Sequence, residues 1–437
     1  MYKQYIKQWW TLVKQHKFYT AIYITGTTLA ISMIMVMAII YHIRSANIAP
    51  ESNRDRVLLV TKAAAVMTEG GSSQSSWSLS YQTVKECYYS LQTPQVVSAG
   101  VNSNGLIFSI GDFYTSVPGS RDVYKTFIYC TDAAFFRVFD YSFIAGKPYS
   151  EEEFQSGIHN VILSETLAYK LFDTNDVINN TMLINDVEYT VTGVVKDVPS
   201  AFRNAYAELW VPYTSIPAVR DLSNGGGIVG AFNAFILAEK KTDFPLIKEE
   251  IEQQRKKYNT SISGWEYKIM DNTILNTFES EIRKLDYSSS FNDIIFRYGI
   301  IALIFLLVPA VNLSGITSSR VQERISEFGV RKVFGATKSA LVNQILTENF
   351  LLTLLGGLTG LITSGIIVYF MRELLLGGYE SMMSGTEINI SFSMLFNIWV
   401  FGITFVICLI LNILSAFIPV WNATRRPIIQ SIINNYS

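Results

Sequence analysis

The stretch AIYITGTTLAISMIMVMAII, residues 21–40, decides the class of fold. It contains no Asp, Glu, Lys or Arg, and it is as long as the roughly 20 mostly apolar residues that a helix needs to cross the hydrocarbon core of a bilayer. Its apolar core also exceeds the roughly 7 to 15 residues of a signal-peptide core, so we expect it to be retained as an anchor. We predict a transmembrane helix over residues 21–43.

Three further runs of this kind follow later in the chain. Charge-free stretches cover residues 298–319, the segment between Glu348 and Arg372, and residues 396–420. A charged residue at the centre of a membrane-spanning helix costs about 2.5 to 3.5 kcal/mol, which makes charge-free runs of this length informative. We predict three more transmembrane helices, at residues 296–316, 345–371 and 396–420.

The composition agrees with a chain that lies partly in a membrane. Charged residues make up 16% of the 437 residues and hydrophobic residues 49%, whereas soluble domains average about 25% charged residues. The formal net charge of -1 excludes a strongly basic protein that binds polyanions, so we expect no nucleic-acid partner. It also excludes an acidic disordered chain.

Positive charges set the expected orientation, because short cytoplasmic segments collect Lys and Arg. Lysines without acidic neighbours precede the first span, and Lys and Arg outnumber Glu in the loop of residues 317–344. The loop of residues 372–395 is acidic, and the tail of residues 421–437 carries Arg without acidic residues. We therefore expect a multi-pass protein of the cell inner membrane, with both termini in the cytoplasm and residues 44–295 outside.

Residues 1–20 have the pattern of a helix that lies on the membrane surface. Apolar and aromatic side chains such as Tyr5 and Trp9 fall on one face, while Lys3 and Lys7 fall on the other. Such a helix buries its apolar face in lipid and turns its lysines to the headgroups. Membrane lipid is therefore an expected partner of this cytoplasmic segment.

The outer segment, residues 44–295, shows alternating strand and helix patterns. NVIL, from Asn160, predicts a strand, and Ser164 predicts a cap for a helix over ETLAYKLF. A hairpin that turns at Asn185 and Asp186 follows. The predicted fold class is therefore a membrane protein with four transmembrane helices and a large mixed α+β extracytoplasmic domain inserted between the first and second spans.

Two other segments of the outer domain have clear patterns. The Gly/Ser-rich residues 68–78 predict a loop. Residues 243–258 predict a charged surface helix that packs Leu246, Ile247 and Ile251 inward.

Residues suited to catalysis or metal binding are scarce. The chain has three His, of which His16 and His42 flank the first span, and three Cys without CxxC spacing. GATKS, residues 335–339, lacks the glycine before the lysine that a phosphate-binding loop requires. We predict a chain that is not an enzyme, with no catalytic residue, no metal site and no bound cofactor. The sequence leaves open whether Cys87 and Cys130 form a disulfide.

The loop SRVQERISEFGVRKVFGATK, residues 319–338, predicts a short amphipathic helix between two spans. Val321, Ile325 and Phe328 recur at helical spacing. Glu327 stands four residues before Arg331, a spacing at which the two side chains can pair. A solvated connector between two spans explains the spacing equally well.

At these residues the sequence resembles the MacB/FtsX-type permeases of ABC transporters. That family carries an RxxEIGLRRxxGA-like segment after its second span, and here the segment reads RISEFGVRKVFGA from Arg324 to Ala336. Phe328 stands where the family more often has isoleucine. The stretches VYKTFIYCTDAAFFRVFDYSFIAGKPYS and VEYTVTGVVKDVP are similar to the family's periplasmic domain. The predicted order of one span, a large outer domain and three spans also agrees.

The resemblance implies that the loop is a coupling helix that docks on a separate ATPase subunit, with ATP and Mg bound by that partner. The residues carried over to the coupling helix are Glu323, Glu327, Phe328, Gly329, Arg331, Lys332 and Gly335. The family also works as a dimer, so a second permease copy or a diverged sibling is an expected partner. Gly356 and Gly360, spaced as GxxxG, are candidates for close packing of spans, including a dimer contact.

The function that the resemblance implies is mechanotransmission for export or efflux. ATP hydrolysis by the partner would move the coupling helix, the spans and the periplasmic domain in turn. Two other functions stay open: a lipoprotein-releasing permease, and an FtsX-like signalling scaffold that activates a periplasmic hydrolase. A periplasmic adaptor, carrier or hydrolase is the corresponding outer partner.

Overall fold

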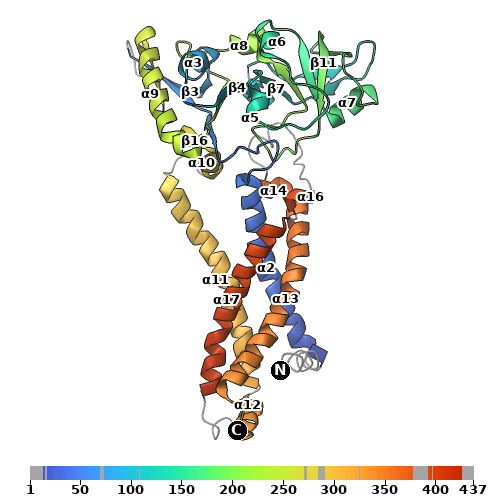
Figure 1. Ribbon diagram of the computed structural model, residues 1–437, viewed down its shortest axis with the longest axis vertical. Helices are drawn as coiled ribbons and strands as arrows, with labels where there is room; N and C mark the ends of the chain where they lie inside the picture. The colour runs from blue at the N-terminus through green and yellow to red at the C-terminus, as the bar shows by residue number, and fades with distance from the viewer. Residues whose placement is uncertain are drawn as a thin grey trace. The chain divides into compact units, whose positions relative to one another are not determined.

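The computed structural model of the chain describes residues 13–14, 17–68, 73–107, 109–269, 273–283, 291–323, 325–376, 392–395 and 397–425. These residues fall into two compact units (Figure 1). The helical unit comprises Met1–His42, Asn292–Leu376 and Ile390–Ser437, and the sheet unit comprises Ile43–Phe291 and Gly377–Asn389. The interfacial helix predicted at residues 1–20 lies mostly outside the described residues.

Four long helices and three short ones form the described part of the helical unit. They are α2 (Lys17–Ser45), α11 (Phe291–Glu323), α12 (Ile325–Val333), α13 (Lys338–Phe370), α14 (Arg372–Leu376), α16 (Phe392–Leu395) and α17 (Ile398–Arg425). Three helical stretches among the described residues are long and apolar enough to cross a membrane: Thr20–Ser45, Lys338–Phe370 and Ile398–Phe417. The span predicted at residues 296–316 lies on α11, and its crossing stays a prediction.

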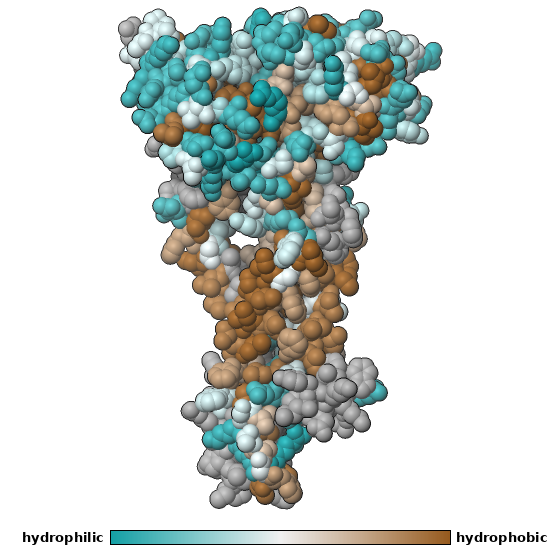
Figure 2. Space-filling view, in the orientation of Figure 1, coloured by the Kyte–Doolittle hydropathy of each residue, from teal (hydrophilic) through white to brown (hydrophobic). Residues whose placement is uncertain are grey.

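The outer faces of these helices are apolar. Figure 2 shows hydrophobic side chains over most of the length of α17, and hydrophilic ones gathered at the end that carries α12. Exposed members of the apolar surface include Leu303 on α11 and Ile403 on α17. Exposed apolar side chains along a long helix are expected where lipid is the solvent.

The packing between α2 and α13 depends on glycine. A Cβ atom added at Gly356 would lie 2.7 Å from Cγ2 of Thr27, and one added at Gly360 would lie 3.1 Å from Cγ2 of Ile31. Both glycines are buried. The glycine face of α13 is therefore covered by α2 of the same chain, and we do not propose a dimer contact through it.

The sheet unit is built on a twelve-stranded mixed sheet. Its strands follow the order β16-β1-β14-β4-β7-β12-β9-β11-β10-β5-β6, and β8 pairs with β11. The β7/β12 and β9/β11 pairs are parallel and the others are antiparallel. The strands are β1 (Val57–Val60), β4 (Val96–Asn102), β5 (Tyr114–Ser116), β6 (Tyr124–Lys125), β7 (Ile128–Thr131), β8 (Phe143–Gly146), β9 (Asn160–Ser164), β10 (Thr181–Ile184), β11 (Val187–Val195), β12 (Leu209–Pro212), β14 (Asn233–Leu237) and β16 (Ile274–Asn276).

Short helices and a second sheet complete the unit. The helices are α3 (Tyr81–Cys87), α4 (Ser103–Leu106), α5 (Phe135–Val138), α6 (Glu151–Gln155), α7 (Glu165–Phe172), α8 (Pro217–Arg220), α9 (Phe244–Ser261), α10 (Thr277–Arg283) and the 3-10 helices η1 (Tyr213–Ser215) and η2 (Lys241–Asp243). The four-stranded sheet has the order β13-β3-β2-β15 and consists of β2 (Ala63–Met67), β3 (Gln74–Leu79), β13 (Val229–Gly230) and β15 (Trp265–Lys268).

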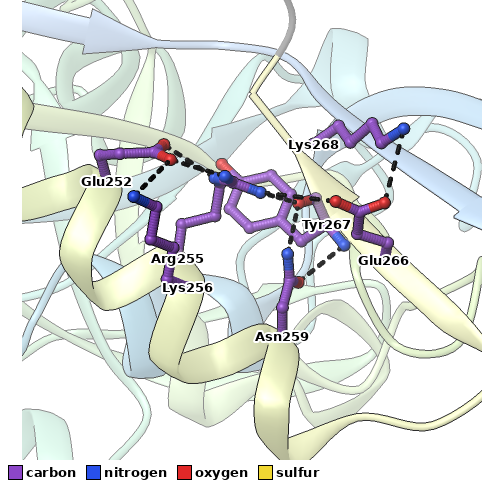
Figure 3. Close-up of polar contacts among 7 residues, drawn as sticks. All are labelled: Glu252, Arg255, Lys256, Asn259, Glu266, Tyr267 and Lys268. Carbon is purple, nitrogen blue, oxygen red and sulfur yellow. Dashed lines mark hydrogen bonds and ion pairs between the residues drawn. The ribbon is translucent and has the colours of Figure 1, made fainter.

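Polar side chains of α9 bind the edge strand β15 (Figure 3). Asn259 accepts a hydrogen bond from the backbone N–H of Tyr267 at 2.9 Å and donates one to its carbonyl at 3.0 Å. Arg255 donates to the same carbonyl and pairs with Glu252 at 2.6 Å. An unpaired strand edge would otherwise invite another strand, so α9 both covers and satisfies this edge.

The sequence predictions for residues 160–198 are confirmed. Residues Asn160–Ser164 form β9, and the Ser164 side chain caps α7 by accepting a hydrogen bond from Leu167 N. The hairpin turns at Asn185 and Asp186, whose φ angles are 47° and 65°. Two central residues with positive φ are typical of the tight turn that joins paired strands.

Two details of the sheet unit differ from the predictions, and the question of a disulfide, which the sequence left open, is answered. The predicted loop at residues 68–78 is wrong from Gln74 onward, because those residues form β3 and pair with β2. Serine-rich composition suggests a loop, but pairing with β2, and with β13 at Ser78 and Leu79, holds this segment as a strand. On α9, Ile247 and Ile251 are buried as predicted, whereas Leu246 is 58% exposed because it lies on the opposite side of the helix. Cys87 and Cys130 are buried free thiols.

Candidate functional site

The helix α12 (Ile325–Val333) stands between the long helices α11 and α13 (Figure 1). Glu327 lies in its first turn, and Arg331 and Lys332 lie in its last turn. An acidic residue at the start and basic residues at the end both stabilise the helix dipole. The sequence predicted one helix over residues 319–338. The described residues are helical up to Glu323 in α11 and over Ile325–Val333 in α12, but the prediction is wrong after Val333, because a turn separates α12 from α13, which begins at Lys338.

The end of α12 is fixed by a turn. Gly335 has a φ of 89°, a conformation that side chains other than glycine rarely adopt. Its N–H donates to the carbonyl of Lys332, and the N–H of Ala336 donates to the carbonyl of Arg331, both at 3.0 Å. These two bonds form a Schellman motif. The Thr337 side chain then caps α13 by accepting from Ala340 N at 3.2 Å, so the turn sets the angle between the two helices.

Arg331 connects α12 to α13. One terminal nitrogen donates to Glu327 Oε1 at 2.6 Å, which confirms the predicted i,i+4 pair. The other donates to Gln344 Oε1 on α13, also at 2.6 Å. Gln344 Nε2 in turn donates to Glu348 Oε1 at 3.1 Å. The guanidinium therefore reaches toward the body of the helical unit.

The other side of α12 exposes apolar groups. Val330 is 49% exposed, Val333 62% and Phe334 86%. The basic residues Lys332 and Lys338 lie nearby, and burial together with the like charge of Lys338 lowers the pKa of Lys332. We call Val330, Lys332, Val333, Phe334 and Lys338 the α12 surface. Exposed apolar groups beside basic ones are a combination that suits a protein partner.

The remaining predicted residues are placed as follows. Gly329 is buried within α12. The side chains of Glu323 and Phe328 lie outside the described side chains, although their backbones belong to α11 and α12. Gly356 and Gly360 belong to the contact between α2 and α13.

The apolar face predicted from Val321, Ile325 and Phe328 stays a prediction, because the side chain of Phe328 lies outside the described side chains. Val321 lies on α11 and packs in a cluster with Leu341, Val342, Ile345 and Val420. Sequence analysis missed Val330, Val333 and Phe334 as surface residues. These apolar residues lie outside the predicted apolar face, and their position there was the sequence signal for an exposed apolar surface.

Other chemically reactive groups have structural partners. His159 Nδ1 lies 3.2 Å from the carbonyl oxygen of Glu188, and its ring stacks on Tyr189. Burial raises the pKa of Cys87 to about 12 and that of Cys130 further, so both thiols stay protonated at neutral pH. Among the described residues, no group of three or more His, Cys, Asp or Glu is placed to hold a metal ion.

Along the chain, one long apolar helix precedes the α/β unit, and further long apolar helices, with a short helix between two of them, follow it; this order is consistent with a membrane permease. Comparison with known proteins gives the family. Residues 20–254 match the MacB-like periplasmic core domain, and residues 299–428 match the FtsX-like permease C-terminal domain. The chain therefore belongs to the MacB/FtsX-type ABC transporter permeases.

Individual relatives are more distant. An uncharacterized ABC transporter permease of Bacillus subtilis, YknZ, is 28% identical over 50% of this chain and 51% of its own length. The macrolide export ATP-binding/permease protein MacB of Escherichia coli K12 is 26% identical over 59% of this chain and 38% of its own length. The chain thus matches about half or less of the length of these relatives.

Solved structures of outer domains are also similar. The periplasmic region of MacB from Actinobacillus actinomycetemcomitans has a TM-score of 0.34 and 14% identity, over 53% of this chain and 94% of that one. A domain of a permease protein from Porphyromonas gingivalis has a TM-score of 0.35 and 16% identity, over 49% of this chain and 88% of that one.

Proposed function

We propose that this chain is the permease subunit of a MacB/FtsX-type ABC transporter, and that it couples ATP hydrolysis by a separate ATPase subunit to movement of its own outer domain for export. The family assignment supports a partner ATPase and dimerisation. ATP and Mg would be bound by that partner. The second permease in the assembly would be another copy of this chain or a diverged sibling.

The observation that carries the proposal is the α12 surface. Phe334, at 86% exposure, and Val333 project from the end of a short helix whose turn is fixed by Gly335. An exposed aromatic residue on a rigid support is the usual anchor of a protein interface. Lys332 and Lys338 are mutually repelling cations that an acidic partner surface would stabilise. An ATPase subunit with an apolar groove and an acidic rim fits both features.

The residues carried over from the family then divide between two roles. Lys332 belongs to the contact surface, and Phe328 and Glu323 are proposed to belong to it as well. Glu327, Gly329, Arg331 and Gly335 instead hold α12 in place, through the ion pair, close packing and the turn. The proposed docking surface therefore consists mainly of residues at the end of α12.

Replacing Phe334 by Ala tests the docking role. We expect Phe334→Ala to weaken binding of the ATPase subunit by roughly tenfold or more, because it removes the aromatic anchor. The measurement is co-purification and titration of the ATPase on the full-length permease in detergent. Phe370→Ala is the matched control, since Phe370 is 77% exposed at the end of α13 and away from the α12 surface. Equal binding by wild type and Phe334→Ala would contradict the proposed surface.

A further inference from the structure

A series of hydrogen-bonded polar side chains runs from Arg331 on α12 to Gln344 and Glu348, which are buried on α13. Gln344 is 4% exposed and Glu348 is 2% exposed, although both lie in a helix that is apolar enough to cross a membrane. Burying a carboxylate is costly unless other groups bind it. The hydrogen bonds that Glu348 and Gln344 make therefore offset the free-energy cost of burying these two side chains.

The donor and acceptor groups of these three side chains fix the direction of the hydrogen bonds between them. The guanidinium of Arg331 can only donate, so Gln344 must turn its carbonyl oxygen toward it. The amide nitrogen of Gln344 then points to Glu348 and donates to its Oε1. A cation and a carboxylate thus bind opposite ends of one amide dipole, an arrangement in which each hydrogen bond strengthens the next.

The guanidinium also has the shape for a two-sided contact. Arg331 holds Glu327 of its own helix with one terminal nitrogen and Gln344 of α13 with the other. A planar fork with two donors at fixed positions ties the two helices together more rigidly than a single ammonium group would. Arg331 is only part-exposed, with 33% of its side chain accessible.

The helix α13 is also connected by hydrogen bonds to α17 and, through α17, to α2. One turn beyond Glu348, the Thr353 hydroxyl on α13 is hydrogen-bonded to Asn412 on α17. Asn412 Nδ2 in turn donates to the Tyr23 hydroxyl on α2 at 3.4 Å. A displacement of α13 would therefore act on α2 and α17 through buried contacts.

We infer that Arg331, Gln344 and Glu348 form a latch that transmits the displacement of α12 into α13, and that Arg331 is a positioning residue rather than an ATPase contact. The inference rests on the proposed function, because it requires an ATPase that moves α12. The α12 surface and the Gly335 turn do not depend on the latch. Loss of the latch therefore leaves the ATPase bound and removes the coupling between its ATP hydrolysis and the permease.

Two substitutions distinguish a latch from a docking charge. Arg331→Lys keeps the positive charge but replaces the planar fork by a shorter, compact ammonium group, so Glu327 and Gln344 are no longer held by two donors at fixed positions. Gln344→Met keeps the side-chain length but can neither accept from Arg331 nor donate to Glu348. Gln322→Met, the same substitution at an exposed position on α11, is the control. Glu348→Gln is a second variant of the buried end that keeps the size of the side chain.

The experiment uses the full-length permease and its ATPase in lipid nanodiscs, and measures both ATPase binding and permease-stimulated ATP hydrolysis. We expect binding within about twofold of wild type for all variants. Stimulation should fall at least about fivefold in Arg331→Lys and Gln344→Met, and less in Glu348→Gln, whose amide oxygen can still accept from Gln344. The Arg331→Lys, Gln344→Met double variant should be no worse than the worse single variant, because both changes break one contact.

The outcomes separate the two proposals. Normal stimulation in Arg331→Lys or in Gln344→Met, or additive losses in the double variant, would overturn the latch alone. A wild-type chain that does not bind the ATPase would overturn the proposed function and the latch with it. Thermal unfolding of each variant confirms that it is folded before coupling is compared.

Discussion

Asp132, at the residue scale, is a buried carboxylate that joins four segments of the sheet unit. One oxygen accepts from Ser98 Oγ at 2.7 Å and from Phe135 N at 2.9 Å. The other accepts from the Tyr89 hydroxyl at 2.5 Å and from Ala99 N at 2.8 Å. Burial raises the pKa of Asp132 to about 6, and these hydrogen bonds oppose that rise.

This raised pKa predicts a pH dependence of stability. Between pH 3.8, the ordinary pKa of Asp, and about pH 6, the folded chain keeps a proton that the unfolded chain has lost. The contribution of Asp132 to stability therefore falls as the pH rises through this window and is constant above it. At about 1.36 kcal/mol per pKa unit, the change amounts to about 3 kcal/mol.

Asp132→Asn isolates this contribution. The amide adds a donor where the carboxylate accepts from Ala99 N–H, so we expect the variant to be less stable by about 1 to 3 kcal/mol at pH 7. Its deficit relative to wild type should be larger at pH 4 and shrink as the pH rises to 6. Thermal unfolding of the detergent-solubilised chain at several pH values measures the deficit. A deficit that stays constant with pH would contradict the assignment.

At the scale of elements, the contact between α2 and α13 is sensitive to a single methyl group. A Cβ at Gly356 would lie 2.7 Å from Cγ2 and 2.8 Å from Cβ of Thr27, so rotation of Thr27 cannot relieve the clash. We expect Gly356→Ala to destabilise the chain by about 1 to 3 kcal/mol, as overpacking of a filled core does.

Gly402→Ala on α17 is the matched control for this substitution. No atom lies within 4 Å of a Cβ at that position. The variant should be neutral or more stable by up to about 1 kcal/mol, since Ala favours a helix over Gly. The measurement is thermal unfolding in one detergent. Equal unfolding temperatures for Gly356→Ala and Gly402→Ala would show that α2 and α13 can move apart to fit the added methyl group without loss of stability.

The elements that the sequence predicted well are those with local signals. Ser164 caps its own helix and Asn185 and Asp186 make their own turn, so both features can be read within a few residues. Gly335 and Thr337 also carry local signals, for the end of α12 and the start of α13. Arg331 shows the limit: its pairing with Glu327 is local, whereas Gln344 lies thirteen residues further along the chain.

Contacts across the whole chain were beyond prediction from one sequence. In the larger sheet, β1 lies between β14 and β16, which come from far along the chain, and this order leaves no local trace. Arg54 is a similar case at the end of α2. It donates to the carbonyl of Ile43 at 2.6 Å and lies over the ring of Phe202, at 4.9 Å from its centre. The ion pair of Arg54 with Glu51 is local in sequence, but its contact with Phe202 becomes visible only in the folded chain.

At the scale of the whole molecule, α11 decides on which side of the membrane α12 lies. The helix joins the sheet unit to α12 in sequence, so the two are on opposite sides only if α11 crosses the bilayer. The basic residues around α12 predict that it lies in the cytoplasm, since Lys and Arg collect on that side. Four crossing helices with both termini in the cytoplasm are the topology that the sequence predicts.

Labelling of single cysteines with a membrane-impermeant maleimide tests this topology. Asp140 in the sheet unit and Ser339 at the start of α13 are exposed positions for Asp140→Cys and Ser339→Cys. The native Cys87, Cys130 and Cys408 are buried, so background labelling should be low. We expect Asp140→Cys to react in intact spheroplasts and Ser339→Cys to react only after the membrane is opened. Labelling of both positions in intact spheroplasts would show that α11 does not cross, and an ATPase in the cytoplasm would then have no access to α12.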